Sequence, residues 1–123
     1  MKDKFDYAKA LEKRLNKDLI ERGYSTKQNK KFNINGINGE CDVFILRNSR
    51  KPNKTYALVF EAKRRDKGES RKKVKEQLKK DNIFIHKKFG KDIRCFNFFA
   101  YSSKEYERNQ TKKAYTIEWL RGL

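Results

Sequence analysis

The sequence is poor in the residue types on which several kinds of site depend. It contains one proline, one histidine, one methionine and two cysteines among 123 residues. The cysteines, Cys41 and Cys95, lie far apart and without the spacing of metal ligands, so they predict neither a zinc site nor a disulfide framework. We expect buried thiols, because free cysteine is among the most buried residue types. His86 stands beside two lysines and predicts a surface or helix-end histidine rather than a catalytic one.

Long apolar runs are also missing. The N-terminal residues 1–4 lack the apolar segment of a secretory signal, and no stretch approaches the roughly 18–20 apolar residues of a membrane span. We therefore expect no membrane partner and a cytoplasmic location, for a cellular protein or for a viral one acting in its host. The length predicts a single domain over residues 1–123, since typical domains run to roughly 100–150 residues.

Acidic residues are scarce relative to basic ones. The chain has 33 Lys and Arg against 16 Asp and Glu, which gives a formal charge of +17. The basic excess is concentrated between Arg50 and Lys91. A polyanion is the partner that such a charge suits, and nucleic acid is the obvious candidate. Nine Phe and six Tyr still provide enough apolar surface for one modest core.

Apolar periodicity and turn residues predict the order helix–hairpin–strand–helix–strand–helix. The expected bounds are helix 3–22, strands 30–35 and 40–46 joined by a turn at 36–39, strand 55–63, helix 69–80, strand 93–101 and helix 115–120. The second strand carries apolar residues on both faces, which predicts a central position in the sheet. Strict alternation would place Cys41, Val43 and Ile45 on one face and Asp42, Phe44 and Leu46 on the other. The segment 48–54 holds the only proline and predicts an exposed turn.

One acidic residue of the first helix lies on its apolar face. At about 100° per residue, Glu12 falls between Ala8 and Leu15 instead of among the lysines of the charged face. Two explanations are open at this point. Glu12 could lie at the margin of the apolar stripe and pair with a lysine, since an unpaired buried carboxylate is costly. It could instead face a metal site.

A carboxylate and an ammonium group end the third strand together. Glu61 and Lys63 are two residues apart, so their side chains project to the same face of the strand. If Asp42 of the preceding strand lies beside them, two hard oxygen ligands and one cation converge where a divalent ion and a phosphate can both bind. The backbone carbonyl of Ala62 adds a third oxygen, and Lys63 is placed to orient or deprotonate a water. The combination predicts hydrolysis of a phosphodiester.

The pattern Glu12, Gly39-Glu-Cys-Asp42 and Glu61-Ala-Lys63, followed by a basic helix, resembles the PD-(D/E)xK nuclease superfamily, most closely the small archaeal Holliday junction resolvases. The resemblance covers most of the chain and implies a restriction-endonuclease-like α/β fold, a mixed sheet flanked by helices. The proline of the motif name is replaced by Cys41, a position that varies in the superfamily. An ExK triplet alone is not specific, because it can equally be an ion pair on an edge strand.

The resemblance also implies roles for individual residues. Asp42 and Glu61 would bind Mg²⁺, with Mn²⁺ able to substitute, Lys63 would be catalytic, Glu12 would assist, and Gln77 would support the site. The expected substrate is branched DNA, and a homodimer would supply one site for each strand cut. The basic residues expected to contact nucleic acid are Lys30, Lys31, Arg64, Arg65, Arg71, Lys72, Lys75 and Lys79.

Other functions fit part of the pattern. A basic DNA-binding protein could retain a nuclease fold without cutting, and a nuclease with the same site could act on duplex or single-stranded DNA. An RNA-binding protein is the weakest of these alternatives, because the sequence contains no RNP1-like segment, and the GxxG letters at 36–39 lie in a hairpin. The charge attracts every nucleic acid, so the sequence does not select among substrate shapes.

Overall fold

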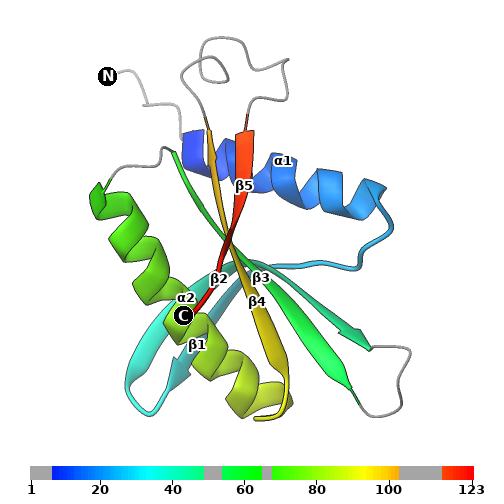
Figure 1. The fold of residues 1–123 in the computed structure, drawn as a ribbon, viewed down its shortest axis with the longest axis vertical. Helices are drawn as coiled ribbons and strands as arrows, with labels where there is room; N and C mark the ends of the chain where they lie inside the picture. The colour runs from blue at the N-terminus through cyan, green and yellow to red at the C-terminus, as the bar shows by residue number, and fades with distance from the viewer. Residues whose placement is uncertain (1–6, 49–53, 65–67, 103–114) are drawn as a thin grey trace.

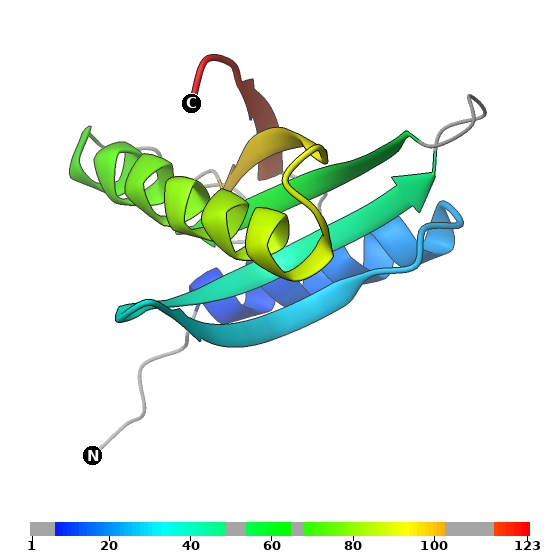
Figure 2. The ribbon, with the colours of Figure 1, turned by 90° about the horizontal axis from the view of Figure 1, so that it is seen from below.

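A five-stranded sheet lies between two helices in the computed structural model, which describes residues 7–48, 54–64, 68–102 and 115–123 (Figures 1 and 2). The elements in chain order are α1 (Tyr7–Glu21), β1 (Lys27–Ile34), β2 (Ile37–Asn48), β3 (Thr55–Lys63), α2 (Gly68–Phe89), β4 (Arg94–Ser102) and β5 (Tyr115–Leu120). The strands are ordered β1-β2-β3-β4-β5 across the sheet. Strands β3 and β4 are parallel and the other neighbours antiparallel, so the sheet is mixed and β2 is central, as predicted.

Each helix covers one face of the sheet and builds its own apolar core (Figure 2). On one face, Leu11, Leu15 and Leu19 of α1 pack on apolar side chains of the central strands, among them Val43 and Phe60. On the other face, α2 packs through a second set of residues: Val74, Leu78, Phe84 and Ile85 of the helix, with Phe44, Val59 and Phe99 of the sheet. Because parallel strands need a crossover connection, α2 also links β3 to β4.

The β1–β2 hairpin is tighter than predicted. Its turn consists of Asn35 and Gly36, with φ values of 50° and 81°. Two central residues with positive φ favour a two-residue hairpin loop, in which asparagine and glycine are the preferred types. The expected turn at 36–39 is therefore wrong, since Ile37 to Gly39 already belong to β2, and β1 begins at Lys27 instead of Lys30.

The expected C-terminal helix at 115–120 is a strand. β5 pairs antiparallel with β4, with Trp119 opposite Phe98 and Tyr115 opposite Ser102. Six residues are too few for a helix that must nucleate alone, whereas Tyr, Thr, Ile and Trp suit a strand. The pairing with β4 satisfies backbone groups that a single helical turn would leave without partners.

Tertiary contacts also move a helix boundary away from the expected position. Helix α2 continues past the predicted end at Lys80 to Phe89, because Phe84 and Ile85 extend its buried stripe. Helix α1 ends at Glu21, close to the predicted end, and residues 3–6 of the predicted helix lie outside the described residues. The third strand has the predicted bounds, 55–63. Most of the expected turn at 48–54 also lies outside the described residues.

Candidate active site

The site begins where β2 and β3 separate. Their ladder ends at the pair Val43–Phe60, and beyond it the β1–β2 hairpin turns away from β3 (Figure 1). Asp42 and Glu61 are the next residues. Their carboxylates, instead of backbone carbonyls, accept the hydrogen bonds between the two strands there. The Asp42 N–H donates to Glu61 Oε1 at 3.4 Å, and the Ala62 N–H donates to Asp42 Oδ2 at 3.0 Å. The two carboxylates are thus held in place by the backbone of the opposite strand.

The strand alternation predicted for β2 fails at the same place. Cys41 packs with Phe44 in the core on the α2 face, whereas Val43 and Ile45 pack in the core on the α1 face. The prediction that Cys41 shares a face with Val43 is therefore wrong. The change of face lies next to Asp42, where β2 leaves β3 and where Asn29 of the paired strand β1 has a positive φ of 53°. Cys41 is buried and Cys95 half-buried, and both thiols are free.

A cleft of about 500 Å³ opens between the diverging strands and the two helices. All residues predicted for catalysis, metal binding or support line it: Glu12, Asp42, Glu61, Ala62, Lys63 and Gln77. The other lining residues are Ala8, Lys9, Glu40, Lys73, Glu76 and Lys80. The N–H and C=O of one strand residue point toward the same neighbouring strand. Because the Ala62 N–H meets Asp42, the Ala62 carbonyl points into the gap left by β2.

Glu12 pairs with a lysine, as one of the two explanations expected, and it also lines the cleft. It is 4% exposed and lies in the cleft, and its Oε2 is 3.8 Å from Lys9 Nζ. The Gln28 side-chain N–H donates to Glu12 Oε1 at 3.3 Å. Burial raises the pKa of the Glu12 carboxyl above its ordinary value, and the negative charge of Asp42 raises it further. The carboxylates of Glu12 and Asp42 are thus held close together at an energetic cost, which Lys9 and Gln28 only partly offset.

A second buried carboxylate, Asp81 of α2, was not predicted. It is fully buried, and its Oδ2 has no hydrogen-bond donor among the described residues. Its ligand atoms and those of Glu61 and Cys41 lie within 4.8 Å of one another, the only such group of three in the described part of the chain. Burial raises the pKa of Glu61 well above its ordinary value, with a hydrogen bond and charge from Asp81 adding to the shift. Burial and the neighbouring Asp81 thus both disfavour the charged form of Glu61.

The sequence did contain a signal for Asp81. Counted from Val74 and Leu78, position 81 continues the apolar stripe of α2, so a carboxylate lies there on a buried face just as Glu12 does in α1. Because the helix was expected to end at Lys80, position 81 was not assigned to its buried face. An aspartate one residue past a predicted helix end has no defined face.

Gln77 connects the helix to the strands of the cleft. Its side-chain N–H group donates to the Glu40 carbonyl at 3.1 Å and to Asp81 Oδ1 at 2.9 Å. Gly39 allows this approach, because a Cβ at Gly39 would lie 3.1 Å from Gln77 Nε2 and would overlap the Phe32 ring. Gln77 thus fixes α2 against β2 and orients the carboxyl group that faces Glu61.

The buried acid pair predicts a pH-dependent stability. The pKa of Asp81 is raised from 3.8 to about 6, mainly by burial and opposed by hydrogen bonds from Glu61 and Gln77. The folded chain therefore holds a proton that the unfolded chain has lost, and the free energy of unfolding falls as pH rises from about 4 to about 6.

Asp81→Asn should remove the part of this fall that Asp81 contributes, leaving that of Glu61, and keeps the acceptor for Gln77. We expect the variant to be more stable than the wild type at pH 8, by on the order of 1–3 kcal/mol. Urea unfolding of both proteins between pH 4 and pH 8 measures the difference, with the exposed Asp92→Asn as the control. Parallel stability curves for Asp81→Asn and the wild type would contradict the assignment of a raised pKa to Asp81.

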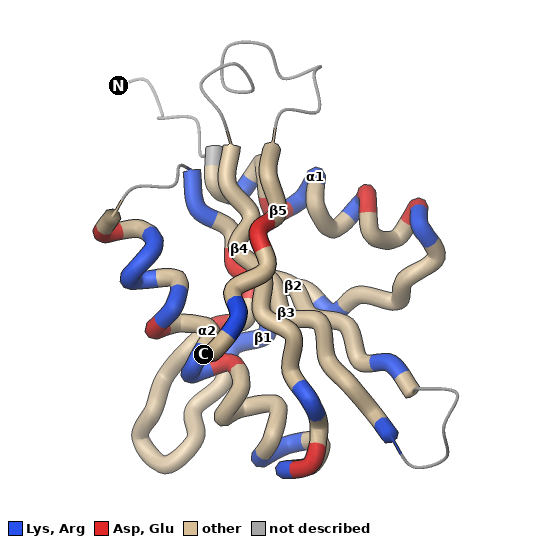
Figure 3. Tube along the Cα trace, viewed as in Figure 1, with Lys and Arg blue, Asp and Glu red and all other residues tan. Residues whose placement is uncertain are grey.

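Lysine and arginine residues lie on both helices and on several strands (Figure 3). Lys9, Lys63, Lys73 and Lys80 line the cleft itself. Of the residues predicted to contact nucleic acid, Lys72, Lys75 and Lys79 lie on a neighbouring exposed face of α2, and Lys31 and Arg64 are also exposed. Lys30 is half-buried on β1, and Arg65 lies outside the described residues. Arg71 forms a two-pronged ion pair with Glu118 of β5, with one contact at 3.2 Å, which ties α2 to the edge strand.

The donor atoms of the cleft suit a divalent ion of the magnesium type. Glu12, Asp42 and Glu61 offer carboxylate oxygens, and Ala62 offers a carbonyl, which are the hard ligands that Mg²⁺ prefers. Mg²⁺ usually keeps several waters, and the volume of the cleft allows them. A cation would also offset the negative charge that raises the pKa of Glu12.

Comparison of the chain with protein-family models, with curated proteins and with solved structures gave no match. In the described part of the chain, neither helix is long and apolar enough to cross a membrane.

Proposed function

We propose that the chain is a Mg²⁺-dependent endodeoxyribonuclease of the PD-(D/E)xK type, which hydrolyses phosphodiester bonds in branched DNA. The observation that carries the proposal is the convergence of Glu12, Asp42, Glu61 and Lys63 in one cleft at the point where β2 and β3 separate. These residues come from three elements, so their convergence is a property of the fold and not of one local motif.

Each residue has a distinct task in this proposal. Asp42 and Glu61 would hold Mg²⁺ together with the Ala62 carbonyl, and Glu12 would hold a second ion or orient a water. When bound, Mg²⁺ supplies Lewis-acid stabilisation of the phosphate and activation of the attacking water. Lys63 orients the water and offsets negative charge on the phosphate in the transition state. Lys73 and Lys80 of α2 hold the phosphate backbone on the opposite wall of the cleft.

Burial of the acids favours an enzyme over a DNA-binding protein that does not cut. Glu12 is 4% exposed and Glu61 3% exposed, and both lie in a chain of strongly positive charge whose partner is an anion. Buried carboxylates weaken the attraction of phosphate and cost stability through desolvation. A protein that only binds DNA gains nothing from them, whereas a metal-dependent nuclease requires them.

The branched substrate and the homodimer are the finer parts of the proposal. Cutting two strands symmetrically at a junction needs two equivalent sites, which a two-fold pair supplies. The same cleft in a monomer would serve a nuclease of duplex or single-stranded DNA.

A substrate panel tests the proposal directly. Labelled four-way junctions, flaps, duplexes and single strands are incubated with the protein and Mg²⁺, then with Mn²⁺, and then with EDTA. We expect cleavage of the junction in Mg²⁺ or Mn²⁺ and none in EDTA. Binding that is indifferent to metal and leaves every substrate intact would identify a DNA-binding protein and overturn the nuclease assignment.

Glu12→Gln provides a finer test of the cleft. If Glu12 supports the metal or its water, the substitution should reduce Mg²⁺-dependent cleavage by on the order of 10²-fold. Folding should be kept or improved, because the variant no longer buries a charge and still accepts a hydrogen bond from Gln28. Cleavage rates and thermal melting are measured on the same preparation, with the exposed Glu21→Gln as the control. Full activity of Glu12→Gln would leave Asp42, Glu61 and Lys63 as the catalytic set.

A further inference from the structure

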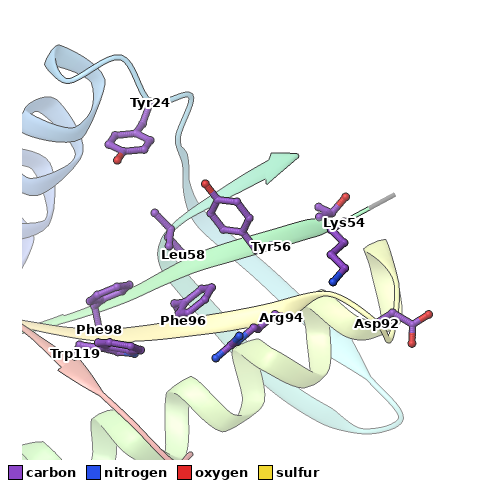
Figure 4. A pocket seen from close by; sticks show the side chains of 10 residues that line it. Tyr24, Lys54, Tyr56, Leu58, Asp92, Arg94, Phe96, Phe98 and Trp119 are labelled. Atoms are coloured by element: carbon purple, nitrogen blue, oxygen red, sulfur yellow. The ribbon is translucent and has the colours of Figure 1, made fainter. Parts of the chain in front are cut away.

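A second hollow, separate from the cleft, lies on the sheet face that carries α1. It has a volume of about 820 Å³ and shares no lining residue with the cleft. Five aromatic or apolar side chains from β3, β4 and β5 line its floor: Tyr56, Leu58, Phe96, Phe98 and Trp119 (Figure 4). Tyr24, which follows α1, closes one side. We refer to this hollow as the aromatic groove.

Three rings of the groove form a continuous row across neighbouring strands. Tyr56 of β3 and Phe96 of β4 have ring centroids 6.0 Å apart, and Phe96 and Trp119 of β5 are 5.9 Å apart. Trp119 is 44% exposed, which is unusual for the largest apolar side chain in a chain of this size. The row therefore leaves aromatic surface accessible to a ligand instead of burying all of it in the core.

Arginines accompany the aromatic side chains at the groove. The guanidinium carbon of Arg94 lies 4.9 Å from the centre of the Phe96 ring, and that of Arg121 lies 4.0 Å from the centre of the Trp119 ring. Arg47 lies 5.0 Å from the centre of the Tyr24 ring. Arg94 and Lys54 are the cations of the lining and Asp92 is its acidic residue, whereas Arg47 and Arg121 lie over rings that line the groove. The groove thus combines aromatic surfaces with an excess of positive charge.

We propose that the aromatic groove binds an unpaired segment of DNA strand, with bases stacked on the row of rings and phosphates paired with its arginines. Aromatic platforms bordered by cations are the general solution for binding single strands without sequence preference. A second copy of the chain is a poor occupant, because pairing two such grooves would bring the cations of both copies together. DNA supplies the opposite charge and planar bases at once.

The position of the groove agrees with the nuclease assignment, on which the identity of the ligand as DNA rests. Tyr56 and Glu61 are both on β3, five residues apart, which is about 16 Å along a strand. An unpaired strand beside a branch point could therefore occupy the groove while the adjoining duplex lies at the cleft. Stacking in the groove itself requires neither metal nor cleavage.

The only tryptophan of the chain reports on the groove. Trp119 fluorescence is followed while a deoxythymidine oligonucleotide of about 12 nucleotides is added in EDTA, so that cleavage plays no part. We expect saturable quenching with the single strand and little change with a duplex of equal length. An oligoribonucleotide that bound more tightly would overturn the assignment to DNA, and no quenching would overturn the proposal as a whole.

The affinities of variants for a labelled single-stranded oligonucleotide, measured by fluorescence anisotropy, show whether the strand binds at the groove. Trp119→Ala and Arg94→Gln should each weaken single-strand binding by roughly 10-fold. The matched controls Ile20→Ala and Lys87→Gln remove an exposed apolar side chain and an exposed charge outside the groove, and should change binding by less than about 2-fold. Because Arg94 is exposed, Arg94→Gln tests the groove even if Trp119→Ala fails to fold. Equal losses in Arg94→Gln and Lys87→Gln, with none in Trp119→Ala, would show binding by overall charge and contradict a built site.

Sedimentation of the same proteins tests the remaining possibility, that the groove is an interface between two copies of the chain. A wild-type dimer that Trp119→Ala converts to a monomer, without any effect of the oligonucleotide on wild-type fluorescence, would make the groove an interface between copies. The proposal for the groove can also be wrong while the nuclease assignment is right, because cleavage in Mg²⁺ is measured independently. Conversely, quenching by single strands in a protein that never cuts would leave the groove intact and overturn only the nuclease.

Discussion

Lys63→Ala should lower the rate of Mg²⁺-dependent DNA cleavage by on the order of 10³-fold or more. Lys63 lies in the cleft two residues after Glu61, and the proposed mechanism places its ammonium group beside the phosphate to be cut. Removing the ammonium group leaves the negative charge of the transition state without a stabilising cation. DNA affinity should change little, since 32 of the 33 basic residues remain. Single-turnover cleavage and equilibrium binding on the same junction measure the two effects.

Two further variants make this experiment specific. Lys13→Ala removes an equally positive but exposed side chain of α1 and should cut like the wild type. Lys63→Arg keeps the charge but replaces a compact ammonium by a planar guanidinium that cannot lose its proton, so it should recover only part of the rate. Turnover near the wild-type value in Lys63→Ala would remove Lys63 from the mechanism.

Asp42→Asn is expected to stop cleavage and to weaken the binding of divalent ions. The substitution keeps the side-chain oxygen that accepts the Ala62 N–H, so the junction of β2 and β3 should stay intact. It removes the negative charge that a hard cation requires. Isothermal titration with Mg²⁺ and with Mn²⁺ measures the affinity directly. The wild type should also melt at a higher temperature in Mg²⁺, because an ion that binds only the folded chain stabilises it, and Asp42→Asn should lose most of this gain.

The control for Asp42 is a carboxylate away from the cleft. Glu21→Gln removes an exposed negative charge at the end of α1 and should leave the metal titration unchanged. Identical titrations of Asp42→Asn and the wild type would exclude Asp42 as a ligand, even if cleavage were lost.

The sequence by itself determined the features that depend on local periodicity and residue type. The strand 55–63 has the expected bounds, because an apolar run between turn residues has one stable local outcome. The sequence also placed Glu12 on the buried face of a helix and Asp42 on a central strand. The helical period fixes the face of a helix residue without knowledge of its partners.

Only the tertiary structure decided how these faces meet. β5 is a strand because β4, the preceding strand, offers it a ladder, and α2 extends to Phe89 because the sheet covers its apolar stripe. Cys41 changes face next to Asp42, where β2 leaves β3. The Asp81–Glu61 pair and the cleft itself arise from the packing of α2 on that edge. Such contacts join segments far apart in the chain, and no local pattern of residues encodes their geometry.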